Sequence, residues 1–352
     1  MKVTKKRLMR FGLVAVGTIA VLVAVAAIGL SRAGGVDGVM RQTARAMIVA
    51  QQSDQFDDGR IHVITLGTGT PAPGSSRLPA ANIIFAGREV ILVDAGEGAS
   101  RTMSSMLLPV HRISTVLITH LHSDHIGGLG PVLNESWNSY RAHDIDVYGS
   151  KGVTDILDGL ALQYKADIHY RSADHVEHND PKYALGVAHV LDVTPEDGLV
   201  RVFERNGVIV DAFHVDHGHI EPAFGYRIEY NGRSAVFSGD TVATPLLVDA
   251  AENADVLFHE AMNMRMMDNA AKAFDELDMP VHARRARAVT KYHAGTLEVA
   301  KVAAQANVKK LVLTHLDPGP PNRIAKALFV QGMDEHYGGP IVIAEDRMQF
   351  SW

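Results

Sequence analysis

The 352-residue chain contains no cysteine. A disulfide framework is therefore excluded, and no thiolate is available as a nucleophile or as a zinc ligand. Any metal site must instead use histidine, aspartate and glutamate, and the chain has 18 histidines. Aromatic residues are also sparse, at 6%, whereas 47% of the residues are hydrophobic, which suits a folded protein with a sizeable core.

Only one long hydrophobic run is present. Residues 11–30, FGLVAVGTIAVLVAVAAIGL, carry no charge and follow a basic run between Lys2 and Arg10. A helix of this length measures ~30 Å, which matches the hydrocarbon core of a bilayer. We expect residues 1–35 to form an inner-membrane anchor with the rest of the chain exported to the periplasm, because basic flanks stay in the cytoplasm. A cleaved signal peptide, which would leave a periplasmic or secreted protein, and a buried core helix are the alternatives.

Positive charge is scarce outside this N-terminal segment. Residues 1–35 hold six of the 34 lysines and arginines and none of the 40 aspartates and glutamates, so residues 36–352 carry a net charge of −12. With this net charge, residues 36–352 exert no long-range attraction on a polyphosphate backbone. No cluster of basic residues with interleaved aromatic residues stands out in the sequence. We therefore expect a small-molecule ester as substrate, no nucleic-acid partner, and membrane contact only through the N-terminal helix. The oligomeric state stays open, a homodimer included.

Residues 36–58 are predicted to be a connector, and short apolar segments bounded by glycine-containing turns follow it. These segments predict strands. The predicted strands cover residues 61–67, 80–87, 89–96, 113–120, 208–215, 223–230, 233–240, 254–261 and 309–316, and residues 341–350 are predicted to form a pair of strands or a strand and a bend. Helices are predicted at 98–108 and 296–308, the second from apolar residues at helical spacing.

Strands and helices alternate in two similar halves. This rhythm predicts two sheets packed face to face with helices outside, which is an α/β four-layer αββα sandwich over residues 59–352. Residues 131–205 are less regular, and we predict an insertion that forms a wall or lid near the site. Its histidines are expected at the surface: His169, His175, His178 and His189.

Four residues that can bind metal gather in the stretch THLHSDHIGG, residues 119–128. They follow a predicted buried strand, so they lie in the loop at its carboxyl end. His120 and His122 can point the same way in an extended segment, and Asp124 and His125 stand at the next turn. Zinc accepts imidazole nitrogen and carboxylate oxygen, and a catalytic zinc keeps one position for water. A polar loop with chance histidines does not explain this density, so the stretch predicts a metal site.

The pattern HLHSDH resembles the H-x-H-x-D-H signature of the metallo-β-lactamase superfamily of hydrolases. Further segments are similar to that family in the same order: LGTGTP, LVDAGEG, FSGDT and LVLTHLDP. The segment DHGHIEPAFGYRIEYNGRSAVFSGDT resembles the branch that contains arylsulfatases, ribonuclease Z and phosphodiesterases. The resemblance covers roughly residues 60–350 and implies the metallo-β-lactamase fold.

The resemblance also implies two zinc ions, with manganese or iron as alternatives, that activate a water for attack on an ester. The first ion would be held by His120, His122 and His217 and the second by Asp124, His125 and His315, with Asp240 bridging them. For His217, the neighbouring His214 and His219 remain alternatives. Asp94 would take a structural role close to the metal loop.

Glu260 and His293 match segments from which the ribonuclease Z-like branch forms a proton shuttle toward the leaving group. A protonated histidine is a suitable acid for a departing alkoxide or phenolate. We therefore assign catalysis to Asp124, Glu260 and His293, the first of them as a metal ligand. Alternatively, His293 caps its helix and Glu260 makes a structural ion pair. His259 is expected to be structural.

The expected function is that of a dinuclear zinc hydrolase acting on a small anionic ester, either a phosphodiester or a sulfate ester. One alternative is a ribonuclease Z-like nuclease, which would need RNA, the cytosol and a basic docking arm. Another is a hydrolase of lactones or β-lactams, which has no use for the pair of Glu260 and His293. A binding protein on an inactive scaffold would show broken ligand positions, and none of the seven is missing.

Overall fold

The computed structural model describes residues 31, 34–51, 56–72, 75–175 and 177–352. The chain divides into two compact units, residues 1–53 and residues 54–352. The described part of the first unit is mainly the helix α2, Gly35–Gln51, whose side chains are mostly exposed.

The predicted membrane or signal helix over residues 11–30 lies outside the described residues, so the anchoring of the chain stays a prediction. Among the residues that the structure does describe, no helix combines the length and the apolar character needed to cross a bilayer.

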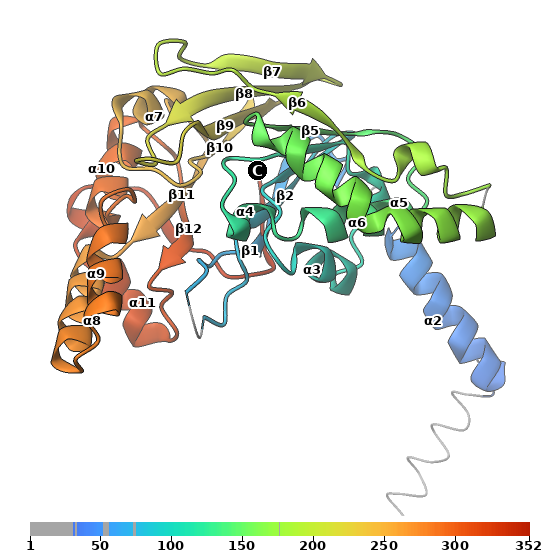
Figure 1. Cartoon of the computed structure of the whole chain (residues 1–352), viewed down its shortest axis with the longest axis horizontal. Coiled ribbons are helices and arrows are strands. Elements are labelled where there is room, and N and C mark those ends of the chain that lie inside the picture. Colours follow the sequence, from blue (N-terminus) through green and yellow to red (C-terminus); the bar gives the residue numbers. More distant parts are fainter. Residues whose placement is uncertain (1–30, 32–33, 52–55, 73–74, 176) are drawn as a thin grey trace, which may run out of the picture. The chain divides into compact units, whose positions relative to one another are not determined.

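The second unit contains two seven-stranded sheets (Figure 1). The first sheet has, in spatial order, β14 (Met348–Ser351), β1 (Ile61–Gly67), β2 (Ala81–Ala86), β3 (Glu89–Val93), β4 (Thr115–Leu117), β5 (Ile145–Gly149) and β6 (Gly186–Val190). The second has β13 (Ile341–Ile343), β12 (Leu311–Asp317), β11 (Val256–Met262), β10 (Arg233–Phe237), β9 (Ala223–Tyr230), β8 (Val208–Val215) and β7 (Val200–Arg205).

Both sheets follow one plan. Neighbouring strands are antiparallel from β14 to β3 and from β7 to β10, and parallel from β3 to β6 and from β10 to β13. Parallel strands need long crossover connections, which are usually helical. The crossovers therefore supply helices for the outer faces of both sheets.

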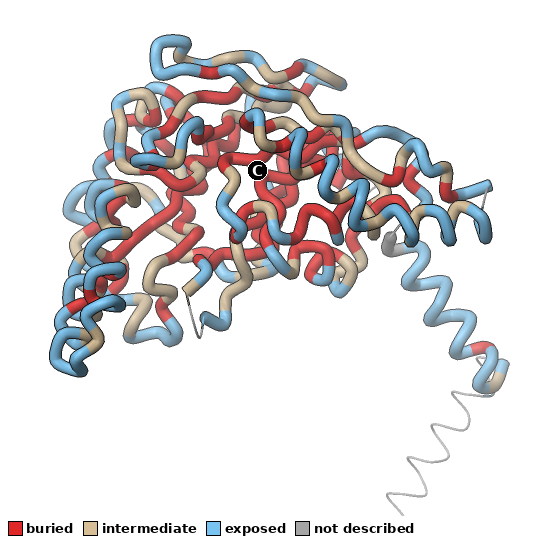
Figure 2. The backbone as a smooth tube through the Cα atoms, in the orientation of Figure 1, coloured by how far each residue is buried: buried red, intermediate tan, exposed pale blue. Residues whose placement is uncertain are grey.

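The core lies in three apolar layers, which appear as the buried interior in Figure 2. In β1, Ile61 and Val63 belong to the layer shared by strands of both sheets, whereas Ile64 and Leu66 pack in the layer that holds helical residues. Strand side chains alternate between the two faces, so a strand covered on both sides is apolar throughout. This explains why these strands stood out in the sequence as continuous apolar runs.

Helices cover the outer faces. The first sheet packs against α3 (Ala99–Ser105), α5 (Leu129–Asn138) and α6 (Gly152–Asp174), and the second against α7 (Pro245–Ala250) and α10 (Thr296–Gln305). The remaining helices are α4 (Ser123–Ile126), α8 (Met264–Glu276), α9 (Pro280–Val289) and α11 (Arg323–Phe329), with single 3-10 turns at η1 (Val110–Arg112), η2 (Pro181–Tyr183) and η3 (Met333–Glu335). The predicted two-sheet α/β architecture is confirmed.

Residues 131–205, for which we predicted an insertion, contribute to both sheets. They contain β5 and β6 at one edge of the first sheet, β7 at one edge of the second, and the long helix α6. In β6, burial is only partial and follows no strict alternation, because this strand lies at the edge. That weak pattern explains why the segment was hard to interpret, and its role as a lid stays a prediction.

Two glycines allow the loop after β3 to touch the loop that carries the histidine cluster. The amide of Ala95 donates to the carbonyl of His125 at 2.7 Å, and the amide of Gly128 donates to the carbonyl of Ala95 at 2.7 Å. A Cβ on Gly128 would lie 2.2 Å from the carbonyl oxygen of Gly96, and one on Gly96 would lie 2.5 Å from that of Asp124. Only glycine permits this close approach of two backbones.

Gly128→Ala should therefore destabilise the fold by about 1–3 kcal/mol, because a methyl group must displace backbone atoms. Gly159→Ala is the matched control, since Gly159 is an exposed glycine within α6 and a Cβ there meets nothing within 4 Å. The control should stabilise the helix by about 0.5–1 kcal/mol. Chemical denaturation measures both changes, and equal stability of the two variants would contradict the close contact.

Candidate metal centre and catalytic pair

The first sheet supplies four of the predicted site residues. His120 and His122 lie in the loop after β4, and Asp124 and His125 lie in the short helix α4 that follows. The side chains of His120, Asp124 and His125 are buried, while His122 is accessible to solvent. The loop thus presents one partly accessible imidazole beside three side chains that are closed off from solvent.

The second sheet supplies the other three. His217 follows β8, Asp240 follows β10, and His315 lies in β12. These positions are at the carboxyl ends of their strands, as is the loop after β4 in the first sheet. Crevices at the carboxyl ends of strands are the usual position of sites in α/β folds. Both sheets therefore contribute to one site at one edge of the unit.

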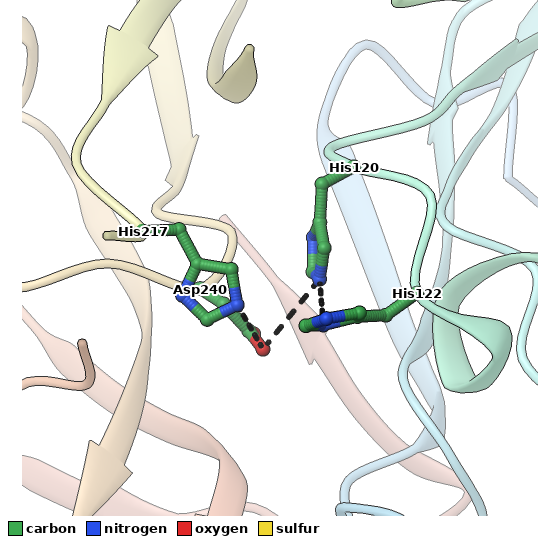
Figure 3. A group of neighbouring side chains, drawn as sticks. All are labelled: His120, His122, His217 and Asp240. Carbon is green, nitrogen blue, oxygen red and sulfur yellow. Dashed lines mark hydrogen bonds and ion pairs between the residues drawn. The ribbon is translucent and has the colours of Figure 1, made fainter. Parts of the chain in front are cut away.

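The first group of side chains comprises His120, His122, His217 and Asp240 (Figure 3). Nε2 of His120 lies 2.9 Å from Nδ1 of His122 and 3.9 Å from Oδ2 of Asp240. Nε2 of His217 lies 3.8 Å from the same Oδ2. Their polar atoms therefore converge on one small volume.

The second group comprises Asp124, His125 and His315. Oδ2 of Asp124 lies 3.2 Å from Nε2 of His315 and 3.5 Å from Nε2 of His125. Oδ2 of Asp240 lies 3.4 Å from Nε2 of His315 and 3.5 Å from Nε2 of His125. One oxygen of Asp240 is thus close to both groups, which is the geometry that a bridging ligand requires.

The electrostatics of the two groups differ. Burial lowers the pKa of His217 to about 4 and keeps the pKa of His120 well below its usual range, so both imidazoles are neutral at pH 7. Burial would raise the pKa of Asp240, but the charges on His315 and His125 outweigh it and hold that pKa well below its usual range. His120 and His217 beside an ionised Asp240 are thus in the protonation state that binds zinc. In the second group burial opposes the charge on His125 and His315, but Asp240 outweighs it and raises both pKa values, so an ion bound there would have to displace protons.

Hydrogen bonds fix which ring nitrogen of His125 and of His217 faces the site. Nδ1 of His125 donates to Oδ2 of Asp94 at 2.8 Å, and Nδ1 of His217 donates to the carbonyl of Tyr292 at 2.9 Å. Asp94 also accepts from the amide of Thr119 at 2.9 Å. In each case the outer nitrogen is held by an oxygen and Nε2 is left for the site, which is how metal-binding histidines are normally oriented.

The residues present fit a metal centre. Nε2 of His125, Nε2 of His217 and Oδ1 of Asp240 are buried and have no hydrogen-bond partner within the described part of the chain. An unsatisfied buried polar atom costs about 1–3 kcal/mol, so three together call for a partner that is not a protein group. Imidazole nitrogens and carboxylate oxygens without sulfur suit zinc, manganese or iron.

His315 reaches the site through a local irregularity of its strand. Opposite β11, Glu260 pairs with Thr314 and Ala261 with Leu316, so His315 is the extra residue of a bulge. Its backbone has a φ of 44°, in the left-handed region that only a minority of non-glycine residues adopt. Bulges often re-aim a side chain beside an active site. The strand interpretation of residues 309–316 was right, but alternation alone could not show this turn.

Glu260 and His293 form the predicted pair beside these groups. Nδ1 of His293 donates to Oε1 of Glu260 at 2.8 Å, and the same oxygen accepts from the amide of Thr241 at 2.9 Å. His293 also lies within ligand distance of Asp240 and His315. Burial opposes the charge on His293, but the carboxylate of Glu260 outweighs it and raises the pKa of His293 to about 9.

Three other histidines fall outside the site. His219 is exposed, and Nε2 of His214 lies 2.8 Å from the carboxylate of Glu221, so the structure places His217 rather than either neighbour in the first group. His259 is buried, and its Nδ1 donates to the carbonyl of Glu260 at 2.6 Å. Burial lowers the pKa of His259 to about 4, as expected for a structural neutral imidazole.

Comparison with known proteins agrees with this geometry. Residues 89–316 match the model of the beta-lactamase superfamily domain. The chain is a hydrolase of the metallo-β-lactamase superfamily. It is 34% identical over 261 residues to a ribonuclease Z of Mycobacterium marinum, an alignment that covers 73% of this chain and 87% of that protein. A ribonuclease Z of Mycobacterium avium is 32% identical over 262 residues, with 73% and 86% coverage.

Solved structures share the fold. The metallo-β-lactamase fold protein YhfI from Bacillus subtilis superimposes with a TM-score of 0.58 at 18% identity, over 83% of this chain and 100% of that one. The short form of human tRNase Z superimposes with a TM-score of 0.57 at 24% identity, over 82% and 98%.

These relatives correct one of the predictions. We expected no nucleic-acid partner, yet the relatives that are a third identical are named as ribonucleases. The prediction rested on the net charge of −12, and a net charge does not show how charge is distributed locally. Residues 279–297 contain Arg284, Arg285, Arg287 and Lys291 and no acidic residue, and they lead directly into the site. A count of charge in short windows would have found them.

Asp240→Ala should remove most of the bound zinc together with turnover, because one carboxylate oxygen faces both groups. Loss of residues that only orient metal ligands already weakens binding ~10–100-fold, so the loss here should be at least as large. Asp249→Ala, at an exposed position in α7, is the matched control. Elemental analysis after gel filtration measures the metal, and full occupancy in Asp240→Ala would argue against a bridging role.

Proposed function

We propose that this hydrolase is a metal-dependent phosphodiesterase that cleaves RNA. The observation that carries the proposal is the pair of Glu260 and His293 beside the metal-binding groups, because such a pair can protonate a poor leaving group such as a ribose oxygen. The relatives named ribonuclease Z support the same substrate class.

The seven predicted ligands would hold two zinc ions, or manganese or iron. Ions bound there would supply an activated water and neutralise charge on the phosphoryl oxygens. The protein contributes orientation, because Asp94 and the carbonyl of Tyr292 fix the rings of His125 and His217. It also excludes water, since Asp240 and Glu260 are both almost fully buried.

His293 would act on the leaving group. At pH 7 the imidazole is protonated, because the pKa is raised to about 9. Its Nδ1 hydrogen is engaged by Glu260, so the proton on Nε2 is the one available for transfer. When water oxygen attacks phosphorus and the bond to the ribose oxygen breaks, Nε2 gives its proton to that oxygen. Glu260, which is held by the amide of Thr241, keeps its hydrogen bond to Nδ1 of His293 and so keeps the imidazole ring oriented.

A small anionic phosphodiester is the second candidate substrate. The net charge of −12 on residues 36–352 favours it, because long-range repulsion penalises a polyanion more than a single diester. The chemistry at the site would be the same. The two candidates differ in whether residues around the site bind the flanking nucleotides.

Metal-loaded chain should hydrolyse both a single-stranded oligoribonucleotide and bis(p-nitrophenyl) phosphate, and chelation should stop both reactions. The panel also contains p-nitrophenyl sulfate, nitrocefin and a lactone, which should react far more slowly, because they present no phosphodiester. Activity on the small diester without RNA cleavage would favour the second candidate. Hydrolysis of the sulfate or the β-lactam alone would contradict both.

His293→Ala should keep both metals but slow RNA cleavage ~100-fold or more, with a much smaller loss on p-nitrophenyl esters, whose leaving group needs no proton. Wild-type activity on RNA should also fall as the pH rises through about 9, where His293 loses its proton, and His293→Ala should lack this alkaline limb. Equal losses on activated and unactivated esters would argue against a proton donor.

A further inference from the structure

Tyr292 lies between the first metal-binding group and the predicted proton donor. Its ring centroid is 5.2 Å from that of His217 at 83°, and 5.0 Å from that of His293 at 46°. The exposed ring of His219 stands 6.1 Å away, almost perpendicular to it. The tyrosine ring therefore borders the place where a leaving group must accept its proton.

The side chain of Tyr292 remains available for contact with a ligand. Tyr292 is only partly buried, and its hydroxyl makes no hydrogen bond to any residue that the structure describes. The backbone carbonyl, not the ring, holds His217. Gly218 backs the residue, because a Cβ there would come within 3.1 Å of the Cβ of Tyr292. The side chain of Tyr292 thus packs against Gly218 and borders the site next to His217 and His293.

Arg285 adds a positive charge on the helix that leads to Tyr292. It is exposed on α9 and forms no ion pair with any described residue, unlike Arg287, which pairs with Asp275. Burial raises the pKa of Tyr292, and the charge of Arg285 counteracts this rise. Burial also raises the pKa of Asp317, where His315, His293 and then Arg285 counteract it. A guanidinium that pairs with no described carboxylate therefore lies on α9 (Pro280–Val289), the helix that ends three residues before Tyr292.

We propose that Tyr292 and Arg285 form a nucleotide subsite on the leaving-group side, where the tyrosine ring stacks on a base and the guanidinium binds the neighbouring phosphate. The subsite rests on the proposed function, which it makes more specific. Proteins read unpaired RNA by stacking bases on aromatic rings and pairing phosphates with arginine. Because the stacking partner adjoins His293, the base that binds is the one attached to the departing ribose.

The test compares three substrates: the dinucleotide UpU and the two methyl uridine phosphates that each lack one of its nucleosides. Tyr292→Leu should lower kcat/KM for UpU ~10-fold, mainly through KM, because the stacking contact is lost. The loss should be small on the methyl ester that lacks the departing nucleoside. Tyr292→Phe should retain most activity, since it keeps the ring. Tyr170→Leu, at an exposed tyrosine of α6, is the matched control.

Calorimetric binding of uridine 5′-monophosphate and the metal content give readouts that do not depend on turnover. Tyr292→Leu should weaken nucleotide binding ~10-fold and keep the metal, because the carbonyl contact to His217 remains. Equal losses on all three substrates, or metal loss in both the Leu and Phe variants, would overturn the subsite. A wild type that hydrolyses none of the three would instead contradict the proposed function.

Arg285→Ala should reduce the salt dependence of oligouridylate binding, with the slope of log K against log salt smaller by about 1. Arg284→Ala removes the same charge one residue earlier on α9, which points about 100° away around the helix. This control should leave the slope nearly unchanged. Identical slopes in the two variants would mean that Arg285 acts only as general surface charge, and would overturn its place in the subsite.

Discussion

The carboxylate of Asp240 is the interaction on which the site depends. One oxygen of this side chain lies between 3.4 and 3.9 Å from imidazole nitrogens that come from the loop after β4, from α4, from the end of β8 and from β12. Such a crowded position is stable only if charge is balanced, because a buried carboxylate without partners costs several kcal/mol. The histidines balance it when protonated, and cations would balance it when bound. The arrangement of both sheets, with their carboxyl ends at one edge, is what delivers these groups to a single point.

Much of this arrangement could be predicted from the sequence. The segments 208–215 and 223–230 were predicted as strands and correspond to β8 and β9 at both ends, because apolar residues and turn glycines delimit them clearly. The metal loop was evident because its residues are adjacent in sequence. The choice among His214, His217 and His219 was not, since all three lie within six positions and only the turn after β8 decides which ring is buried. The bulge at His315 was equally hidden, because it depends on the register with β11 rather than on residue type.

The error about nucleic acid has a physical origin. Net charge describes the far field of a molecule, and most acidic residues of this chain can lie away from the site without affecting a bound phosphate, because the Debye length at physiological salt is about 8 Å. What matters at a site is the charge within that distance. The stretch that leads to Tyr292 and His293 is basic over nearly twenty positions, and its effect is local. A sequence can therefore be acidic as a whole and still carry a surface suited to a phosphate backbone.

The division of the ligands between the two sheets has a consequence for the energetics of the whole unit. His120 and Asp124 follow β4 of the first sheet, whereas His217 and Asp240 follow β8 and β10 of the second sheet and His315 lies in its strand β12. An ion bound between them would link the two halves of the sandwich. Because the unfolded chain has no such arrangement of ligands, metal occupancy and folding would be coupled by mass action, and the melting temperature would depend on the free-metal concentration. Metal availability in the cell would then govern how long the protein persists as well as how fast it turns over.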